Sequence, residues 1–196
     1  AQGQMTDYYS NVKFADTEIK NPNSSLLTTH AGLVGNLSSL VKVLLKAGYG
    51  ATFISSQNSD DFSSAIGQLE IQYQLGPKDY LQVGFKRDLK PTSIFKYYGL
   101  MRGYLEYRRS FNHRWNVKAK LNYDDIRYGT AVVGPTNARV DGNIVGNITV
   151  TYNVLEWLDL SIIESFDYRT SDYITEGGNG VSYFHNDINF TIRFRY

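Results

Sequence analysis

The chain of 196 residues contains no cysteine, only three histidines and only four prolines. Without cysteine it can form neither disulfide bonds nor metal sites built from thiolates. The formal net charge is +1 and charged residues make up 20% of the chain, so bulk charge favours neither a nucleic acid nor an anionic membrane surface as a partner. The length fits one domain, residues 1–196, with room for a core of useful size.

Long hydrophobic runs are also missing. No stretch of about 18 apolar residues occurs, and the mean hydropathy is −0.35, so a transmembrane helix is excluded. A membrane-spanning β-barrel is not excluded, because half of its strand residues face a polar interior and lower the average hydropathy. The 16 tyrosines suit such a barrel, since their apolar rings and polar tips form aromatic girdles at the two membrane surfaces.

Motifs for enzymatic chemistry are few. The sequence has neither the Gly-x-Ser-x-Gly nucleophile elbow nor the zinc-binding His-Glu-x-x-His motif. One pair leaves an enzyme open: His185 and Asp187 lie two residues apart, near the outer end of a predicted strand, where they could activate a water molecule. A polar surface pair without catalytic function is the simpler interpretation. We therefore expect no catalytic residues, no cofactor and no metal.

The last thirteen residues alternate between apolar and polar side chains. The odd positions of 184–196 are all polar, whereas the even positions are Phe184, Asn186, Ile188, Phe190, Ile192, Phe194 and Tyr196. Successive side chains of a strand point to opposite faces, so the pattern predicts a strand with one apolar and one charged face. This strand would be about twice the ordinary length and would end on an aromatic residue, which favours a membrane-spanning barrel.

The same alternation predicts eight further strands, which begin near residues 26, 40, 65, 80, 97, 115, 143 and 158. Short turns are predicted at 36–38, 76–79, 112–114 and 155–157, and longer loops at 55–61, 89–96, 129–138 and 170–180. Alternating short and long connections are typical of membrane barrels, whose periplasmic turns are short. A tenth strand at residues 7–14 would make the number even and place both ends of the chain on the periplasmic side.

We therefore predict an all-β fold, an antiparallel transmembrane β-barrel of about ten strands in the lipid of a bacterial outer membrane. A soluble β-sandwich also alternates apolar and polar residues, but the long strands and the rhythm of the connections favour the barrel. Glu164 departs from the pattern, because it has the parity of Leu160 and Ile162. Either Glu164 faces lipid or a local β-bulge turns it away.

On a barrel, the polar face of the strands lines the interior. The charged side chains predicted there are Lys42, Lys46, Glu70, Lys86, Asp88, Arg102, Glu106, Arg108, Lys118, Lys120, Asp124, Asp159, Asp167, Arg169, Asp187, Arg193 and Arg195. In a narrow barrel these charges would pair with one another and fill the interior. In a wider barrel they would line a hydrated pore and set its selectivity.

Two parts of the sequence resemble known proteins. The terminal residues Phe190, Ile192, Phe194 and Tyr196 resemble the C-terminal signal of Gram-negative outer-membrane proteins, which implies that the barrel-assembly machinery binds this end. The segments 69–73, 84–88, 104–108 and 121–123 resemble a family of outer-membrane β-barrels associated with exopolysaccharide biosynthesis and export. The second resemblance covers about residues 40–196, and members of that family usually have a barrel about twice as long. The chain is then either a shortened relative or the C-terminal part of a larger barrel.

This resemblance implies a porin-like channel or export component for exopolysaccharide, with periplasmic export proteins among its partners. The residues themselves leave two other functions open. One is a non-conducting structural or adhesive barrel that binds a partner through its outer loops. The other is a hydrolase that uses His185 and Asp187 at the rim.

Overall fold

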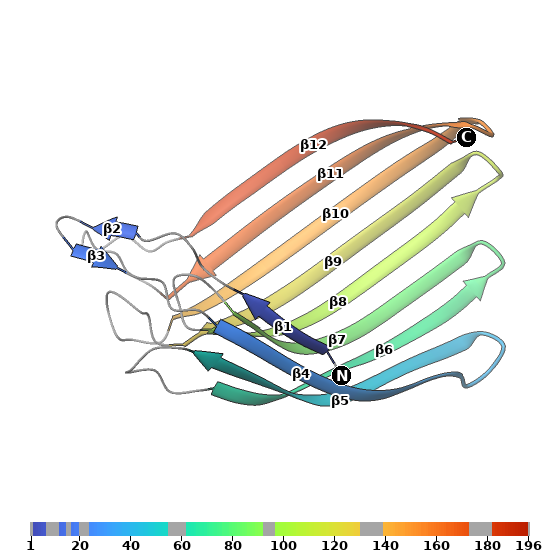
Figure 1. Ribbon diagram of the computed structural model, residues 1–196. Helices are drawn as coiled ribbons and strands as arrows, with labels where there is room; N and C mark the ends of the chain where they lie inside the picture. The colour runs from blue at the N-terminus through green and yellow to red at the C-terminus, as the bar shows by residue number, and fades with distance from the viewer. Residues whose placement is uncertain are drawn as a thin grey trace.

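The computed structural model describes residues 2–6, 12–14, 17–19, 24–54, 62–91, 97–129, 139–172 and 182–195. Within these ranges every regular element is a β-strand. Ten strands form one antiparallel sheet in the order β1-β4-β5-β6-β7-β8-β9-β10-β11-β12 (Figure 1). A separate small sheet consists of β2 (Val12–Phe14) and β3 (Thr17–Ile19). No helix in the described part of the chain could cross a membrane.

Nine long strands follow one another as neighbours in the large sheet, and all nine were predicted. They are β4 (Ser24–Asn36), β5 (Val41–Ile54), β6 (Phe62–Gly76), β7 (Asp79–Pro91), β8 (Tyr97–Phe111), β9 (Trp115–Tyr128), β10 (Val140–Leu155), β11 (Leu158–Ser171) and β12 (Tyr183–Phe194). Each has between 12 and 16 residues, about twice the length of an ordinary strand. The prediction of an all-β antiparallel fold is confirmed.

The connections between these strands alternate in length as predicted. Two to four residues join β4 to β5, β6 to β7, β8 to β9 and β10 to β11, whereas five to eleven residues join the other neighbours. The four short turns all lie at one end of the sheet (Figure 1). In the turn between β8 and β9, Asn112 has a φ of 50°, the left-handed conformation that asparagine tolerates better than most residues.

The tenth strand of the sheet is not where the sequence predicted it. It is β1 (Gln2–Thr6), which pairs with only the first residues of β4, from Gln2 opposite Thr28 to Thr6 opposite Ser24. Of the predicted strand at 7–14, residues 7–11 lie outside the described residues and 12–14 pair with β3. An alternation of period two could not distinguish a strand of the large sheet from this short local hairpin.

The large sheet is curved and open. Among the described strands, β12 pairs only with β11 and β1 pairs only with β4. Figure 1 shows β12 along one rim of the curved sheet and β4 and β5 along the other. The predicted closure into a barrel is therefore not observed in the part of the chain that the structure describes. The backbone groups along β12 and along residues 29–36 of β4 form two free edges there.

Alternate residues divide the sheet into an apolar face and a polar face. On β6, Leu69 and Ile71 are exposed, whereas Gln68 and Gln72 are half-buried and Glu70 is buried. The polar side chains are the more enclosed set because the sheet curves toward them. This distribution is the reverse of a soluble domain, whose apolar residues fill a core. Only three apolar side chains of the described residues are buried, namely Leu26, Leu89 and Leu100.

Glu164 lies on the apolar face. The register of β11 is continuous against residues 141–153 of β10 and against β12, so no bulge turns this side chain away. Its cross-strand neighbours are Ile148 on β10 and Ile188 on β12. Of the two alternatives that the sequence left open, the bulge is excluded.

Candidate functional site

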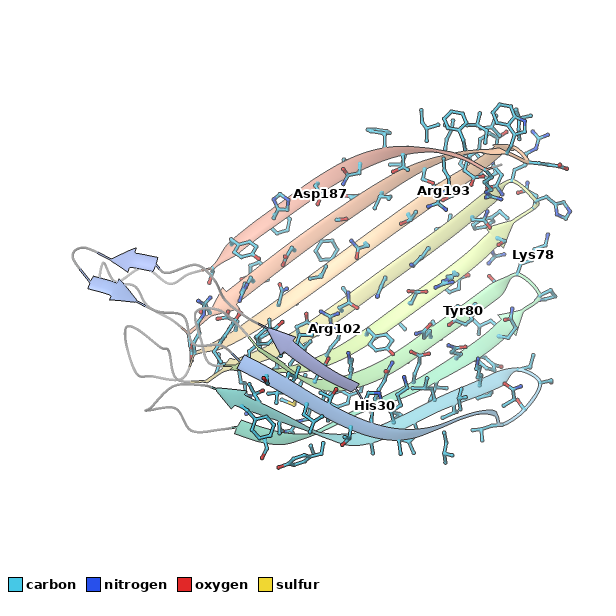
Figure 2. All side chains as sticks on the ribbon, viewed as in Figure 1. His30, Lys78, Tyr80, Arg102, Asp187 and Arg193 are labelled. Atoms are coloured by element: carbon cyan, nitrogen blue, oxygen red, sulfur yellow. The ribbon has the colours of Figure 1, made fainter. Side chains whose placement is uncertain are left out.

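The polar face of the large sheet is the candidate site. Register places side chains of eight neighbouring strands side by side in one row, which we call the cationic row. Its members, from β5 to β12, are Lys46, Gln68, Lys86, Arg102, Asp124, Asn143, Arg169 and Tyr183. Figure 2 shows His30 on β4 and Asp187 on β12 toward opposite sides of the sheet, with Tyr80 and Arg102 between them.

The centre of the cationic row is an ion pair between Arg102 and Asp124. Nε and Nη2 of Arg102 donate to Oδ1 and Oδ2 of Asp124, each at 2.7 Å. The side chain of Asp124 is 3% exposed and that of Arg102 is 38% exposed. Two parallel bonds of this kind give the strongest and most directional arginine–carboxylate contact. The sequence predicted both residues on this face, and the register makes them direct neighbours.

A second group surrounds the buried carboxylate of Glu106. Nε of Arg108 donates to Oε1 of Glu106, and Nζ of Lys118 lies 3.7 Å from Oε2. Near the short turns, Nε of Arg195 donates to Oδ2 of Asp159 at 2.9 Å. Both carboxylates are therefore neutralised by cations from the same or the neighbouring strand.

Glu70 differs, because three neutral groups hold its carboxylate. Nε2 of Gln72 donates to Oε1 at 2.7 Å, Nε2 of Gln68 donates to Oε2 at 3.4 Å, and the hydroxyl of Tyr104 also donates to Oε2. Tyr104 reaches Glu70 by lying across Gly84 of the intervening strand, and a Cβ at Gly84 would overlap its ring. A glycine is required there because the ring approaches the backbone closely.

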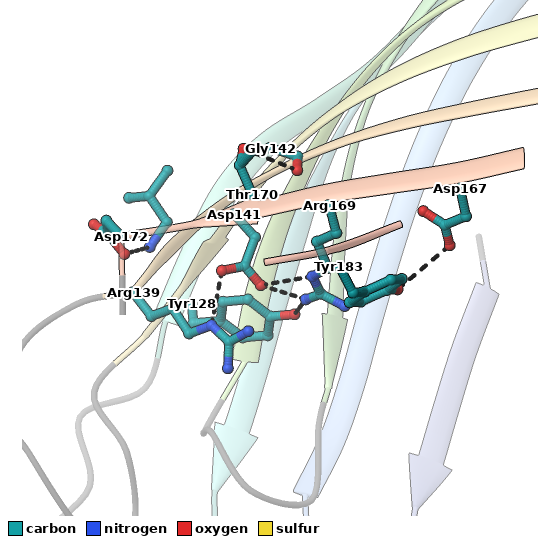
Figure 3. Close-up of polar contacts among 10 residues, drawn as sticks. Tyr128, Arg139, Asp141, Gly142, Asp167, Arg169, Thr170, Asp172 and Tyr183 are labelled. Carbon is teal, nitrogen blue, oxygen red and sulfur yellow. Dashed lines mark hydrogen bonds and ion pairs between the residues drawn. The ribbon is translucent and has the colours of Figure 1, made fainter. Parts of the chain in front are cut away.

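A fourth group lies at the end of the sheet away from the short turns (Figure 3). Asp141 is fully buried; Nε of Arg139 donates to its Oδ1 at 2.7 Å, and Nε of Arg169 donates to its Oδ2 at 3.0 Å. Nη2 of Arg169 also donates to the hydroxyl of Tyr128 at 2.6 Å. Asp141 and Arg139 were not among the predicted residues, because they precede the predicted strand start near residue 143. Their parity with Asn143 was the available signal.

In each of these ion pairs the carboxylate lies deeper than the cation. Asp159 is 3% exposed and its partner Arg195 is 55% exposed; Arg139 and Arg169 likewise extend beyond the buried Asp141. The reason is side-chain length, since short carboxylates stay close to the backbone and long cationic side chains reach over them. The outermost charge on the polar face is therefore positive.

Cationic side chains also outnumber carboxylates on the described strands of this face. The cations are Lys42, Lys46, Lys86, Lys90, Arg102, Arg108, Lys118, Lys120, Arg139, Arg169, Arg193 and Arg195; the carboxylates, four fewer, are Glu70, Asp88, Glu106, Asp124, Asp141, Asp159, Asp167 and Asp187. Every charged residue predicted for the polar face lies there. Lys42, Lys46, Lys120 and Arg193 make no ion pair with any described residue.

A pocket of about 230 Å³ lies on this face between β4 and β7. It is lined by Thr28, His30, Lys46, Ile66, Gly67, Gln68, Lys86, Arg87 and Asp88. Pairing of β6 with β7 ends at Gly67 opposite Arg87, and the pocket lies where these two strands begin to separate. Nζ of Lys86 lies 2.8 Å from Oδ2 of Asp88, whereas the ammonium of Lys46 has no described acidic partner.

The pair proposed for hydrolysis is close but open to solvent. Nε2 of His185 lies 3.7 Å from Oδ1 of Asp187 on the edge strand β12. Asp124 and Asp125, two further carboxylates toward that end, lie on opposite faces, and Asp125 pairs with Arg127 at 3.0 Å. No cluster of His, Asp and Glu side chains in the described ranges could hold a metal ion. A rim hydrolase stays a prediction without added support.

The residues of the predicted assembly signal lie at the end of β12. Phe190, Ile192 and Phe194 are exposed on the apolar face, and Tyr196 lies outside the described residues. The ring centroids of Phe194 and Trp157 are 6.2 Å apart, in a stacked arrangement. The aromatic end of the last strand is therefore accessible along its free edge.

Comparison of the chain with protein-family models, curated proteins and solved structures gives no match. The resemblance to barrels of exopolysaccharide export thus stays a prediction from the sequence.

Proposed function

We propose that the chain forms the wall of a transmembrane β-barrel in a bacterial outer membrane and acts as a channel or export component. The observation that carries this proposal is the exposed apolar face. It runs across all nine long strands and includes Leu45, Ile71, Val83, Leu121 and Phe190. Exposed apolar patches of such extent are not stable in water and mark contact with lipid or another protein.

The height of the apolar face fits a membrane. On β7, Asp79 and Arg87 flank the apolar side chains of Leu81, Val83 and Phe85. The two charged residues are eight positions apart, which corresponds to roughly 27 Å along a strand. With the tilt of about 40° that is usual in membrane barrels, the band between them is roughly 20 Å high, close to the apolar belt of outer-membrane proteins.

Aromatic side chains gather at both margins of this band. At the short-turn end, the ring centroids of Trp115 and Tyr152 are 4.6 Å apart. Toward the other end, Tyr123 and Tyr168 occupy one cross-strand row, on either side of Ile144. Amphipathic aromatic rings at both margins support an apolar band that lies between the two surfaces of a membrane.

The free edges favour a wide, hydrated interior over a filled one. Backbone groups without partners are not tolerated in lipid, so further strands must pair with β12 and with β4 to complete the wall. A barrel of more than ten strands has room for water, whereas a narrow barrel is filled by its own side chains. Side chains of the polar face then line a pore, and their charges act on whatever passes.

Polysaccharide as cargo is inferred from the resemblance, and the chemistry of the polar face is compatible with it. Gln72, Gln82 and Asn147 carry amides that can bind sugar hydroxyls, and Tyr80 and Tyr104 offer rings on which a sugar can stack. The resemblance further implies insertion by the barrel-assembly machinery and contacts with periplasmic export proteins.

Conductance of the purified chain in a planar lipid bilayer tests the proposal. We expect discrete current steps from inserted protein. Gln72→Trp on the polar face should lower the step size, whereas Ile71→Trp, one residue away on the apolar face, should leave it unchanged. Insertion without current at any voltage would contradict a channel and favour the non-conducting, adhesive alternative.

A further inference from the structure

We propose that the polar face selects anionic cargo and holds its acidic groups at the pocket between Lys46 and Lys86. The cargo is a molecule or chain that carries carboxylate, phosphate or sulfate groups. This inference rests on the proposed channel function in one respect, because cargo is selected only if it passes along the polar face. Binding of an anion to the polar face can be measured whether or not the protein conducts.

Three features of the polar face make its accessible surface cationic. Carboxylates such as Asp124 and Asp159 lie on its floor and are nearly inaccessible. Their arginine partners extend over them and keep unused N–H donors toward the open side, because a guanidinium has five. Cations are also in excess, and Lys46 and Lys120 have no described acidic partner. An approaching ion therefore meets ammonium and guanidinium groups first.

The charges are arranged along a line. The cationic row holds Lys46, Lys86, Arg102 and Arg169 but only one carboxylate, Asp124. The adjacent row, from Leu44 on β5 to His185 on β12, contains no lysine or arginine. Neighbouring strands are about 4.8 Å apart, so the row offers a positive track across the sheet. Such a track suits a chain with repeated negative charges better than a single small ion.

The pocket is the part of this track where a bound anion competes least with the protein's own carboxylates for the cationic side chains. Lys46 contributes a cation without a described acidic partner, and Lys86 contributes one whose acidic partner is Asp88. Gln68 and His30 add further hydrogen-bond donors from the neighbouring strands β6 and β4. A volume of about 230 Å³ accepts one acidic group together with part of the residue that carries it. A neutral sugar would gain no charge-assisted bond there.

The proposal distinguishes two kinds of polysaccharide. An acidic chain would exchange its counterions for the lysines and arginines of the cationic row and would bind more weakly as salt rises. A neutral chain would depend on amides and tyrosines alone and would show little dependence on salt. If the cargo is an exopolysaccharide, as the sequence resemblance implies, we infer an acidic one.

Two measurements on the refolded full chain test this inference. The first is equilibrium binding of fluorescent dextran sulfate and of neutral dextran of equal length to the protein in detergent micelles. We expect binding of dextran sulfate only, weakened several-fold as salt rises from about 0.05 to 0.2 M. Equal binding of both polymers, or of neither, overturns the inference.

The second measurement is the reversal potential in a potassium chloride gradient across a planar bilayer. We expect chloride to be more permeant than potassium. Equal permeability or a preference for potassium overturns the inference while leaving the channel function intact. A silent bilayer contradicts the channel function, and the binding of dextran sulfate then still decides the inference.

Variants locate the site. Lys46→Gln should lower the affinity for dextran sulfate by about two-fold, and Lys46→Gln with Lys86→Gln by more, since each removes one charge near the pocket. Arg127→Gln is the matched control, because it removes one positive charge from the opposite face. Equal loss of affinity in Arg127→Gln and Lys46→Gln would place the binding outside the polar face.

Discussion

The two faces of the large sheet are made by the same strands, yet the polar face encloses its side chains and the apolar face exposes them. On the polar face, carboxylates such as Asp124 and Asp141 are almost fully enclosed. On the apolar face, side chains such as Leu121 and Phe190 are exposed. A soluble protein stabilises its fold by burying apolar side chains. Here the apolar side chains can be buried only by whatever surrounds the apolar face. The charged side chains of the polar face must be paired with one another or hydrated.

Two consequences distinguish the faces energetically. On the proposed barrel, lipid covers the apolar band, where an added charge would have neither a partner nor water, so its cost depends on depth in the membrane. A charge on the polar face is tolerated where a partner or water is near, and it is costly only when a buried partner is left alone. The same substitution made at two adjacent residues, one on each face, can therefore distinguish the cost of a charge on the apolar face from its cost on the polar face.

Replacing Ile71 by Arg should have the largest effect. Ile71 lies near the middle of the apolar band, where an arginine costs about 2–4 kcal/mol. Gln72→Arg is the control, because the same side chain then points to the polar face. Urea unfolding of the protein in lipid vesicles measures both. Equal destabilisation by the two variants would show that the apolar face does not contact lipid.

Removing the guanidinium of Arg102 should have the next largest effect. Arg102→Gln leaves the buried carboxylate of Asp124 with at most one neutral donor, and we expect a loss of about 2 kcal/mol. Arg127→Gln breaks the exposed pair with Asp125 and should change stability much less, because solvent screens an exposed pair. The same unfolding assay compares them. Adding Asp124→Asn to Arg102→Gln should restore part of the loss, and no restoration would argue against the pair.

Adding a methyl group under an aromatic ring should have a smaller effect that again differs between the faces. Tyr104 lies over Gly84 on the polar face, and Phe166 lies over Gly146 on the apolar face. Gly84→Ala displaces Tyr104 from its hydrogen bond to Glu70, with an expected loss of about 1–2 kcal/mol. Gly146→Ala should cost less, because Phe166 can swing into lipid. A larger loss for Gly146→Ala in the unfolding assay would reverse this assignment of the faces.

Glu164→Leu should have the smallest effect, and in the opposite direction. It removes a lone carboxylate that lies between Ile148 and Ile188 on the apolar face. We expect a gain of about 1 kcal/mol or less, since acidic side chains cost less in a membrane than lysine or arginine. Thermal unfolding in vesicles measures the gain. A loss of stability would mean that Glu164 meets a partner protein rather than lipid.

The nine long strands could be predicted because apolar and polar residues alternate along much of their lengths, most weakly in Ser24–Asn36. β1 could not, since Gln2–Thr6 contains only one large apolar residue and shows no alternation. The open edges could not be predicted from the sequence either, because curvature and closure depend on how the strands twist against one another. Parity assigns a residue to a face and carries no information about closure.

For the candidate site, too, the sequence predicted the face on which a residue lies but not the contacts that the residue makes. Parity placed Arg102 and Asp124 on the polar face, but only the register of β8 against β9 shows that they pair with each other. The group around Asp141 was missed because it precedes the predicted start of its strand. The role of Gly84 as the seat of a tyrosine ring depends on a contact across three strands, which sequence spacing does not encode.

The direction of the strands restricts what can complete the wall. Because β4 and β12 are the first and last of nine strands that alternate in direction, both run toward the short-turn end. Copies of this nine-strand unit arranged head to tail would therefore meet in parallel, a pairing that bacterial outer-membrane barrels do not use. β1 runs against β4 and so restores opposite directions at the two ends. An even total of strands, with β1 counted among them, is the number at which this sheet can close into a ring of antiparallel neighbours.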